Sequence, residues 1–271
     1  MIIDYLHSIS EPYLVYESGK RPVLITTNTT KDYVCKHNFG QLNTLFNEYI
    51  AVAFLSLWSV QIPKPCFITV SPDHINNFAL ANGLEPAWFR KSCFGSYHLH
   101  YGKELDDFFQ FLNSATLAKF KKEDFLKIAL FDIWVANEDR NAGHTNLLIN
   151  PEGDNLLFYP IDHELIFNSN SGRELYQINE NDTILAHDLF KLLFRKRGVQ
   201  HKEIIAELLI DFEFNITKCN ENIDLILSKI PNDWGLDIVQ KRKFLTNNIF
   251  SETWIKETKK NFQLFYNKWI K

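Results

Sequence analysis

One β-hairpin pattern interrupts a long stretch of helical sequence in the second half of the chain. Two short apolar runs, residues 147–149 and 156–161, flank the turn sequence NPEGD at 150–154. Proline and glycine supply the backbone conformations that such a turn needs. The segment 122–137 and most of the chain after residue 183 show apolar residues at helical spacing. We therefore predict a single hairpin held between helices.

The first hundred residues mix short strand patterns with one helix. Residues 23–27 and 32–37 are β-prone runs joined by a short polar stretch, which predicts a hairpin. Segment 41–58 then carries apolar residues at helical spacing. Two prolines end that helix, and a strand-like apolar run follows at 66–70. The predicted order is strand, strand, helix, strand.

These patterns predict an α+β fold of two closely joined parts. A small β-rich lobe should cover residues 1–100, and a larger, mainly helical lobe of the same domain should cover 101–271. Within the second lobe, 104–113 and 122–137 are predicted as buried helices. No repeat, low-complexity segment or long linker divides the chain into separate domains.

The composition allows a sizeable, aromatic core. A chain of 271 residues with 45% hydrophobic and 23% charged residues is of ordinary globular type. Its 23 phenylalanines predict a core rich in rings. We assign Phe131, Trp134 and the segment 108–111 to that core rather than to a cofactor site.

Charge and cysteine usage exclude several classes of protein. A net charge of −4 argues against a dedicated nucleic-acid binder, and the basic run 195–197 predicts a solvated helix end. The longest apolar stretch, 49–58, is shorter than the roughly 20 residues that cross a bilayer. Four dispersed cysteines predict reduced thiols rather than a disulfide framework or a zinc site. Because the N-terminus also lacks a secretory pattern, we expect a cytoplasmic protein.

Polar residues gather at the two ends of the predicted hairpin. The segment NEDRNAGHTNLLI (137–149) places Asp139 and Asn146 before the first strand, and FYPIDHELIF (158–167) places Asp162 after the second. Antiparallel partners lie about 5 Å apart, so Asn146 and Asp162 should be close. Their oxygens suit Mg²⁺. Asp139 would face the metal without binding it and could orient or deprotonate a hydroxyl.

Turn formation or helix capping is the alternative reason for Asp and Asn at these positions. Two features favour a functional reason. The polar residues interrupt a strongly apolar region, and Asp162 lies in an apolar run where an unpaired charge is costly. Asp132, in the preceding helix, is a candidate for bracing the loop through hydrogen bonds.

A cation for nucleotide phosphates is predicted at Lys36. Strand alternation puts Lys36 on the same face as Val34, and Glu48 follows in an otherwise apolar helix. A strand lysine paired with a glutamate of the next helix is the arrangement by which kinases hold the α- and β-phosphates, although most such pairs are surface charges. No glycine-rich phosphate motif occurs. The turn 28–31 either covers the phosphates or is a plain hairpin turn.

The segments DYVCKH, NEYIA, IPKP and FGS, together with the two segments around the hairpin, resemble the HipA-like kinases. The similarity is to the short bacterial subfamily without an added N-terminal domain, and it covers about residues 20–170 in the order of its motifs. This resemblance implies a bilobal protein-kinase-like fold, with Mg²⁺-ATP between a small β-rich N-lobe (1–100) and a mainly helical C-lobe (101–271).

The resemblance also implies a role for each predicted site residue. Lys36 would contact the phosphates with support from Glu48. Asp139 would be the catalytic base. Asn146 and Asp162 would hold the metal.

The matching positions depart from the subfamily pattern in one place. His144 stands where the subfamily usually has asparagine, two residues before the metal-binding one. His163 fits the subfamily and takes the place of the phenylalanine in the D-F-G sequence of ordinary kinases.

The function that follows is an ATP- and Mg²⁺-dependent serine/threonine protein kinase, similar to HipA-like toxins. Its expected partners are ATP, a protein substrate and an antitoxin or other regulator, with no nucleic acid and no membrane. One alternative is a kinase of a small molecule or lipid head group, although no basic membrane patch is evident. The other alternative is a pseudokinase that binds a partner protein. The presence of all five predicted site residues argues against it.

Overall fold

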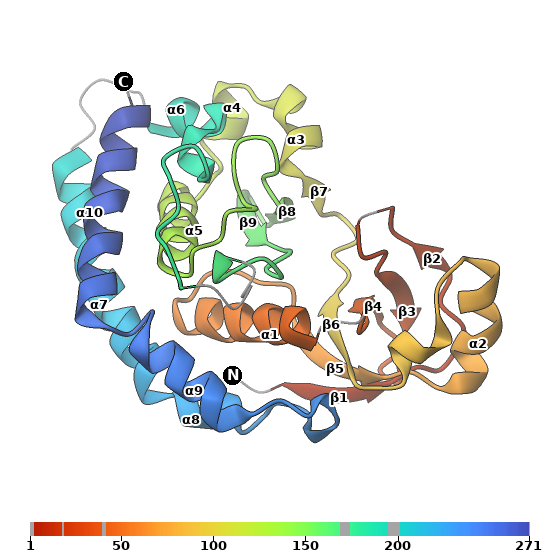
Figure 1. Ribbon diagram of the computed structural model, residues 1–271. Coiled ribbons are helices and arrows are strands. Elements are labelled where there is room, and N and C mark those ends of the chain that lie inside the picture. Colours follow the sequence, from red (N-terminus) through yellow and green to blue (C-terminus); the bar gives the residue numbers. More distant parts are fainter. Residues whose placement is uncertain (1–2, 18, 40–41, 169–173, 195–200, 271) are drawn as a thin grey trace.

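The computed structural model describes residues 3–17, 19–39, 42–168, 174–194 and 201–270. A β-sheet region formed by the N-terminal part packs against a mainly helical C-terminal region (Figure 1). The predicted α+β class is therefore confirmed. The basic run at 195–197 lies outside the described residues. No helix in the described ranges has the length and apolar character needed to cross a membrane.

A six-stranded sheet forms the N-terminal lobe, in the order β1-β5-β6-β4-β3-β2. β1 and β5 are parallel, and the other neighbours are antiparallel. The strands predicted at 23–27, 32–37 and 66–70 are confirmed, whereas the other three are additional. The bounds are β1 (Asp4–His7), β2 (Leu14–Val15), β3 (Val23–Thr26), β4 (Asp32–Lys36), β5 (Pro65–Thr69) and β6 (Cys93–Tyr97).

Gly95 allows β6 to pass closely between β5 and β4. It lies opposite Cys66 on one side and Cys35 on the other. A Cβ atom at position 95 would meet Cys66 Sγ at 2.6 Å and Ile68 Cδ1 at 2.5 Å, so only glycine fits. All four cysteines are free and buried, which agrees with the predicted reduced thiols.

Helix α1 (Leu42–Leu57) lies between the two lobes (Figure 1). It is apolar on nearly all sides, with Phe46, Ile50 and Phe54 fully buried, because it packs on the sheet and on the C-terminal helices together. The chain leaves the helix at Ser59, whose φ is 57°. The predicted helix at 41–58 is confirmed.

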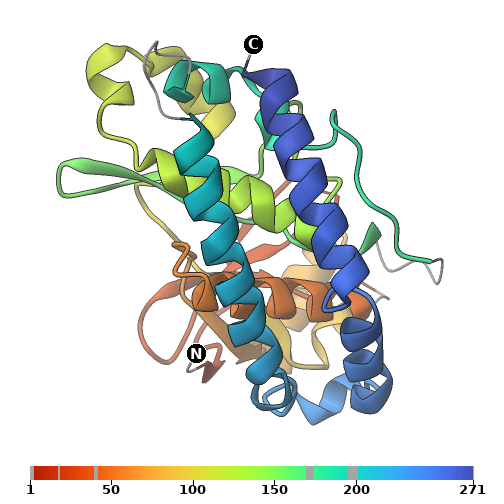
Figure 2. The same ribbon diagram turned by 90° about the vertical axis from the view of Figure 1, so that its left-hand side faces the viewer.

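Three helices organise the C-terminal lobe. Figure 2 shows α7 (His201–Glu221) and α10 (Glu252–Trp269) running antiparallel in front of α5 (Lys122–Trp134). Trp134 anchors this packing, since its indole donates to the carbonyl of Ile249 at 2.8 Å and its own carbonyl accepts from Trp254 at 2.7 Å. Among the described residues, this lobe also contains α4 (Ser114–Leu117), α6 (Asp188–Phe194), α8 (Ile223–Leu227) and α9 (Ile238–Asn247), with short 3-10 turns at Ile184–Ala186 and Asn232–Trp234. Helix α2 (Pro72–Ala81) and a 3-10 turn at Pro86–Phe89 lie between β5 and β6 of the N-terminal lobe.

The predicted buried helix at 104–113 is confirmed only in part. The segment forms the short helix α3 (Leu105–Phe108), which a 3-10 turn (Phe109–Phe111) continues, and Leu105 is its one fully buried side chain. Asn113 ends it by capping α4, because its side chain accepts hydrogen bonds from two backbone amides there. Phe108 and Phe109 pack against the core, whereas Phe111 is 53% exposed, so the assignment of 108–111 to the core is wrong at Phe111.

The hairpin in the C-terminal lobe is confirmed. β8 (Leu147–Glu152) pairs with β9 (Asn155–Pro160), and Gly153 turns the chain with a φ of 59°. The strands extend further into the predicted turn than the sequence indicates. A third strand, β7 (Lys103–Glu104), pairs with β8 and follows the connection from β6.

Replacement of Trp134 by alanine should lower the free energy of unfolding by about 3–5 kcal/mol. The change removes a fully buried ring and leaves the carbonyl of Ile249 without its donor. Urea denaturation followed by circular dichroism measures the loss. The matched control is Phe214→Ala on the exposed side of α7, where the ring is 68% exposed and a change below about 0.5 kcal/mol is expected. Equal losses in the two variants would contradict this packing.

Candidate active site

Strand alternation on β4 aims Lys36 into the space between the lobes. Tyr33 and Cys35 are buried in the sheet core, while Val34 and Lys36 point the other way and line a cavity. This is the orientation that the sequence predicts. Glu48 enters the same space from α1.

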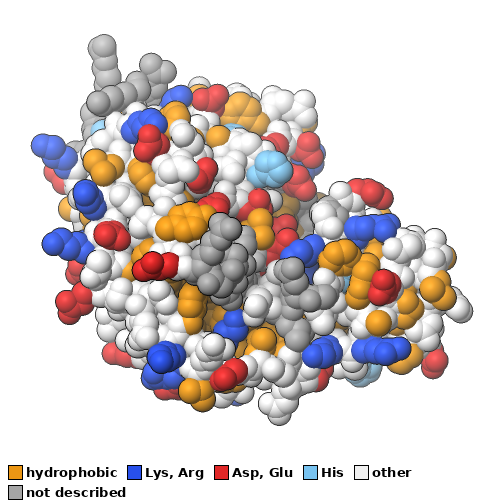
Figure 3. Space-filling view, in the orientation of Figure 1, with side chains coloured by type: hydrophobic (Ala, Val, Ile, Leu, Met, Phe, Trp, Pro, Cys, Tyr) orange, Lys and Arg blue, Asp and Glu red, His pale blue; other side chains and the backbone are white. Residues whose placement is uncertain are grey.

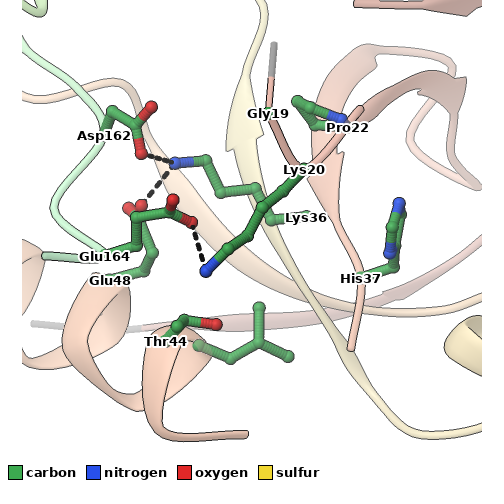
Figure 4. Close-up of a pocket in the computed structure, with 10 residues that line it drawn as sticks. Gly19, Lys20, Pro22, Lys36, His37, Thr44, Glu48, Asp162 and Glu164 are labelled. Atoms are coloured by element: carbon green, nitrogen blue, oxygen red, sulfur yellow. Dashed lines mark hydrogen bonds and ion pairs between the residues drawn. The ribbon is translucent and has the colours of Figure 1, made fainter. Parts of the chain in front are cut away.

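The ammonium of Lys36 lies between two carboxylates from distant parts of the chain. Its Nζ donates to Glu48 Oε1 and, at 2.9 Å, to Asp162 Oδ1 (Figure 4). Burial disfavours charge on Lys36, but Asp162 and Glu48 outweigh it and raise the pKa of Lys36. Burial likewise opposes the charge of Glu48, and Lys36 outweighs it and lowers the pKa of that carboxyl. Both groups are therefore ionised throughout the neutral range.

Asp139 and Asn146 form a second contact, in the loop between α5 and β8. Asn146 Nδ2 donates to Asp139 Oδ2 at 2.9 Å. Asn146 and Asp162 both have left-handed backbones, with φ of 44° and 57°. Such conformations are strained for residues other than glycine, and they often occur at functional sites.

The Arg140 side chain joins the backbone at Asn146 to the backbone just before Asp162. Its guanidinium is fully buried and donates to the carbonyls of Ile161 at 2.5 Å and Asn146 at 3.4 Å. The Ile161 amide in turn donates to the Asn146 carbonyl at 3.0 Å. Arg140 therefore fixes the backbone at Asn146 and immediately before Asp162.

Asp132 of α5 supplies the negative charge for Arg140. Its Oδ1 accepts from Arg140 Nη1 at 2.5 Å and from Asn137 Nδ2 at 3.0 Å. Burial raises the pKa of Asp132 to about 6, while the charge of Arg140 and the amide of Asn137 favour the ionised form. The expected hydrogen bonds between Asp132 and the loop are therefore present, with Asn137 and Arg140 as the donors.

His163 packs behind the lysine site. Its backbone amide donates to Glu48 Oε1 at 2.9 Å, and its Nδ1 lies 3.7 Å from Glu48 Oε2. Burial, followed by the charge of Arg140, lowers the pKa of the His163 imidazole to about 4. The ring is neutral at physiological pH.

A cavity of about 600 Å³ separates the two lobes, within the range of ordinary ligand pockets. Figure 3 shows the notch between the lobes, where acidic and basic side chains gather. Charged and polar side chains line the cavity together with apolar ones. The polar set includes Lys36, Glu48, Asn146 and Asp162 and, on and beside the β6–β7 connection, His98, Lys103, Glu104, Asp107 and Gln110; the apolar set includes Val34, Tyr97, Leu99, Phe111 and Leu148.

The structure brings the five predicted site residues together in two linked groups. Lys36, Glu48 and Asp162 are in direct contact, and so are Asp139 and Asn146. The groups meet through the backbone pairing of Asn146 with Ile161. Their predicted roles remain predictions.

Comparison with known proteins decides the family. A family model described as HipA-like kinase matches residues 15–263. The chain belongs to this family. No curated protein matches its sequence.

Two solved structures are similar to this HipA-like kinase. The Helicobacter pylori proinflammatory kinase CtkA has a TM-score of 0.52 and 13% identity, with 98% of each chain covered, and it shows a shared fold. HipA, from the Shewanella oneidensis MR-1 toxin–antitoxin complex with HipB and operator DNA, has a TM-score of 0.44. Its identity is 10%, over 94% of this chain and 62% of that one.

Sequence reasoning missed the segment that covers the polar end of the site. Gly19, Lys20 and Pro22, between β2 and β3, line a small pocket that shares Lys36 with the large cavity. Residues 28–31 line neither the small pocket nor the large cavity. Of the two alternatives for this turn, it is therefore the plain hairpin turn between β3 and β4. The available signal was the pair Gly19-Lys20 just before a β-prone run, which matches no standard glycine-rich motif.

Replacement of Arg140 by methionine should lower the free energy of unfolding by about 3–5 kcal/mol, because Asp132 is left buried without its counter-ion. Chemical denaturation measures the loss. The matched control, Arg242→Met, breaks an exposed ion pair with Asp224 and should leave the unfolding midpoint nearly unchanged. The double variant Asp132→Asn, Arg140→Met should regain part of the stability. A loss in Arg140→Met no larger than in the control would contradict the bracing role.

Proposed function

We propose that this chain is an ATP- and Mg²⁺-dependent kinase that transfers the γ-phosphate to a serine or threonine hydroxyl of a protein. The observation that carries the proposal is the position of Lys36, held by Glu48 and Asp162 at the polar end of a ligand-sized cavity. Kinases use this lysine–glutamate pair to hold nucleotide phosphates.

The large cavity suits a nucleotide. The apolar side chains of its lining, among them Val34, Tyr97 and Leu99, offer contacts for a purine ring. Lys36, in the same lining, offers its ammonium to the α- and β-phosphates. Glu48 keeps Lys36 charged and directed into the cavity.

Asn146 and Asp162 would hold the magnesium ion. A carboxamide oxygen and a carboxylate are the donors that this hard cation prefers, and both residues line the cavity. When bound, the metal neutralises the charge of the phosphates. Asp162 would exchange its contact with Lys36 for the metal, which frees the lysine for phosphate.

Asp139 would orient the acceptor hydroxyl and take its proton. The carboxylate is only partly buried and its Oδ2 is held by Asn146 at 2.9 Å, so it can face an incoming side chain with a fixed geometry. Most of the rate enhancement would come from positioning and charge stabilisation, as is usual for phosphoryl transfer.

The remaining parts of the proposal rest on family membership. The lobes would divide near residue 100, into 1–100 and 101–271. The kinase would act in the cytoplasm, with an antitoxin or other regulatory protein as a partner, since HipA of the related system was solved with HipB.

The test is transfer of label from γ-labelled ATP with Mg²⁺ to the protein itself and to added protein and small-molecule acceptors. Wild-type protein should label serine or threonine. Asp139→Asn should lower the rate by about 10²–10⁴-fold with little change in ATP affinity, because the base is lost and the nucleotide site is kept. The control Asp154→Asn, at the exposed hairpin tip, should remain fully active.

Each contrary result removes a different part of the proposal. Full activity of Asp139→Asn would contradict its role as base. Label only on a small molecule or lipid would contradict the protein substrate. ATP binding without transfer to any acceptor would favour a pseudokinase.

A further inference from the structure

A second lysine closes the polar end of the site. Lys20, between β2 and β3, reaches across the pocket to the segment after β9, where its Nζ lies 3.1 Å from Glu164 Oε2 (Figure 4). The same small pocket is lined by Lys36, Glu48 and Asp162. The proposed mechanism gives no role to either Lys20 or Glu164.

The backbone around Lys20 is anchored at its C-terminal side. Arg21 has a left-handed φ of 50°, and its guanidinium donates to the carbonyl of Asn82 at 2.9 Å. The carbonyl of Arg21 lies 3.2 Å from His37 Nε2, and the Tyr16 amide donates to the Pro22 carbonyl at 2.9 Å. These contacts fix the backbone directly after Lys20, whose side chain lines the pocket.

This pocket holds one more carboxylate than ammonium groups, so a phosphate chain can enter only where a lysine exchanges a carboxylate for phosphate. Lys20 and Lys36 face three carboxylates, since oxygens of Glu48, Asp162 and Glu164 lie within 4.8 Å of one another. Binding of Mg²⁺ by Asp162 would leave Lys36 free for phosphate. Lys20 lines the same small pocket as Lys36 and is a second cation beside the proposed phosphate site.

We propose that Lys20 is a phosphate-binding residue for the nucleotide, and that Glu164 holds its ammonium across the pocket when no nucleotide is bound. The inference rests on the proposed function, because it needs ATP in this site. Lys20 would leave Glu164 for the phosphate chain. Its ion pair with Glu164 would then compete with ATP and favour release of the nucleotide.

The test measures binding of ATP and of adenosine, without Mg²⁺, by titration calorimetry. Lys20→Met should weaken ATP binding about tenfold or more and leave adenosine binding unchanged, because only the contact with phosphate is lost. Glu164→Gln should tighten ATP binding several-fold, because it frees Lys20 and removes a negative charge that repels phosphate. A second titration of Glu164→Gln with Mg²⁺ present should show the same direction.

The chain offers a matched control pair. Lys64 and Asp4 form an exposed ion pair in the same lobe, 2.6 Å apart and outside both pockets. Lys64→Met and Asp4→Asn should leave ATP and adenosine binding unchanged.

The contrary outcomes separate this inference from the proposed function. Unchanged ATP binding by Lys20→Met, or equal weakening of ATP and adenosine, would overturn the role of Lys20 while the kinase proposal stands. Weaker Mg²⁺-ATP binding by Glu164→Gln would make Glu164 a metal ligand and overturn its role as the resting partner. Absence of ATP binding by the wild-type protein would overturn both.

Discussion

The ion cluster around Lys36 constrains the arrangement of both lobes. A mostly buried ammonium needs nearby carboxylates, and these come from α1 and from the segment after β9. Strand β4, helix α1 and the C-terminal hairpin must therefore meet at one point. The large cavity opens beside that point, so the cluster that joins the lobes also forms the polar end of the candidate nucleotide site.

The strained backbone at Asn146 and Asp162 depends on a second buried charge. Arg140 compensates the left-handed conformations by donating to the carbonyls of Asn146 and Ile161, and Asp132 neutralises it from α5. The helix before the loop thus sets the positions of both proposed metal ligands. This arrangement explains why one charged residue, Asp132, lies within the otherwise apolar end of α5.

The sequence predicts those parts of the structure that local patterns encode. The periodicity of α1, the turn signal of the β8–β9 hairpin and the alternation along β4 are each contained in a few residues, and together they locate the five predicted site residues. Strands β2 and β7 have two residues each and are too short for a pattern, β1 has a single buried side chain, and Gly95 interrupts the pattern of β6. The contacts of Lys20 with Glu164 and of Arg140 with Ile161 join distant segments, and no local pattern encodes them.

The central claim is that Lys36 and Asp162 exchange their mutual contact for phosphate and metal when Mg²⁺-ATP binds. A crystal structure with Mg²⁺ and a non-hydrolysable ATP analogue tests it directly. The account predicts Asp162 and Asn146 on the metal, Lys36 Nζ on a phosphate oxygen and still paired with Glu48, and Asp139 facing the γ-phosphate. A nucleotide bound elsewhere, or Asp162 still paired with Lys36 beside a bound nucleotide, would contradict it.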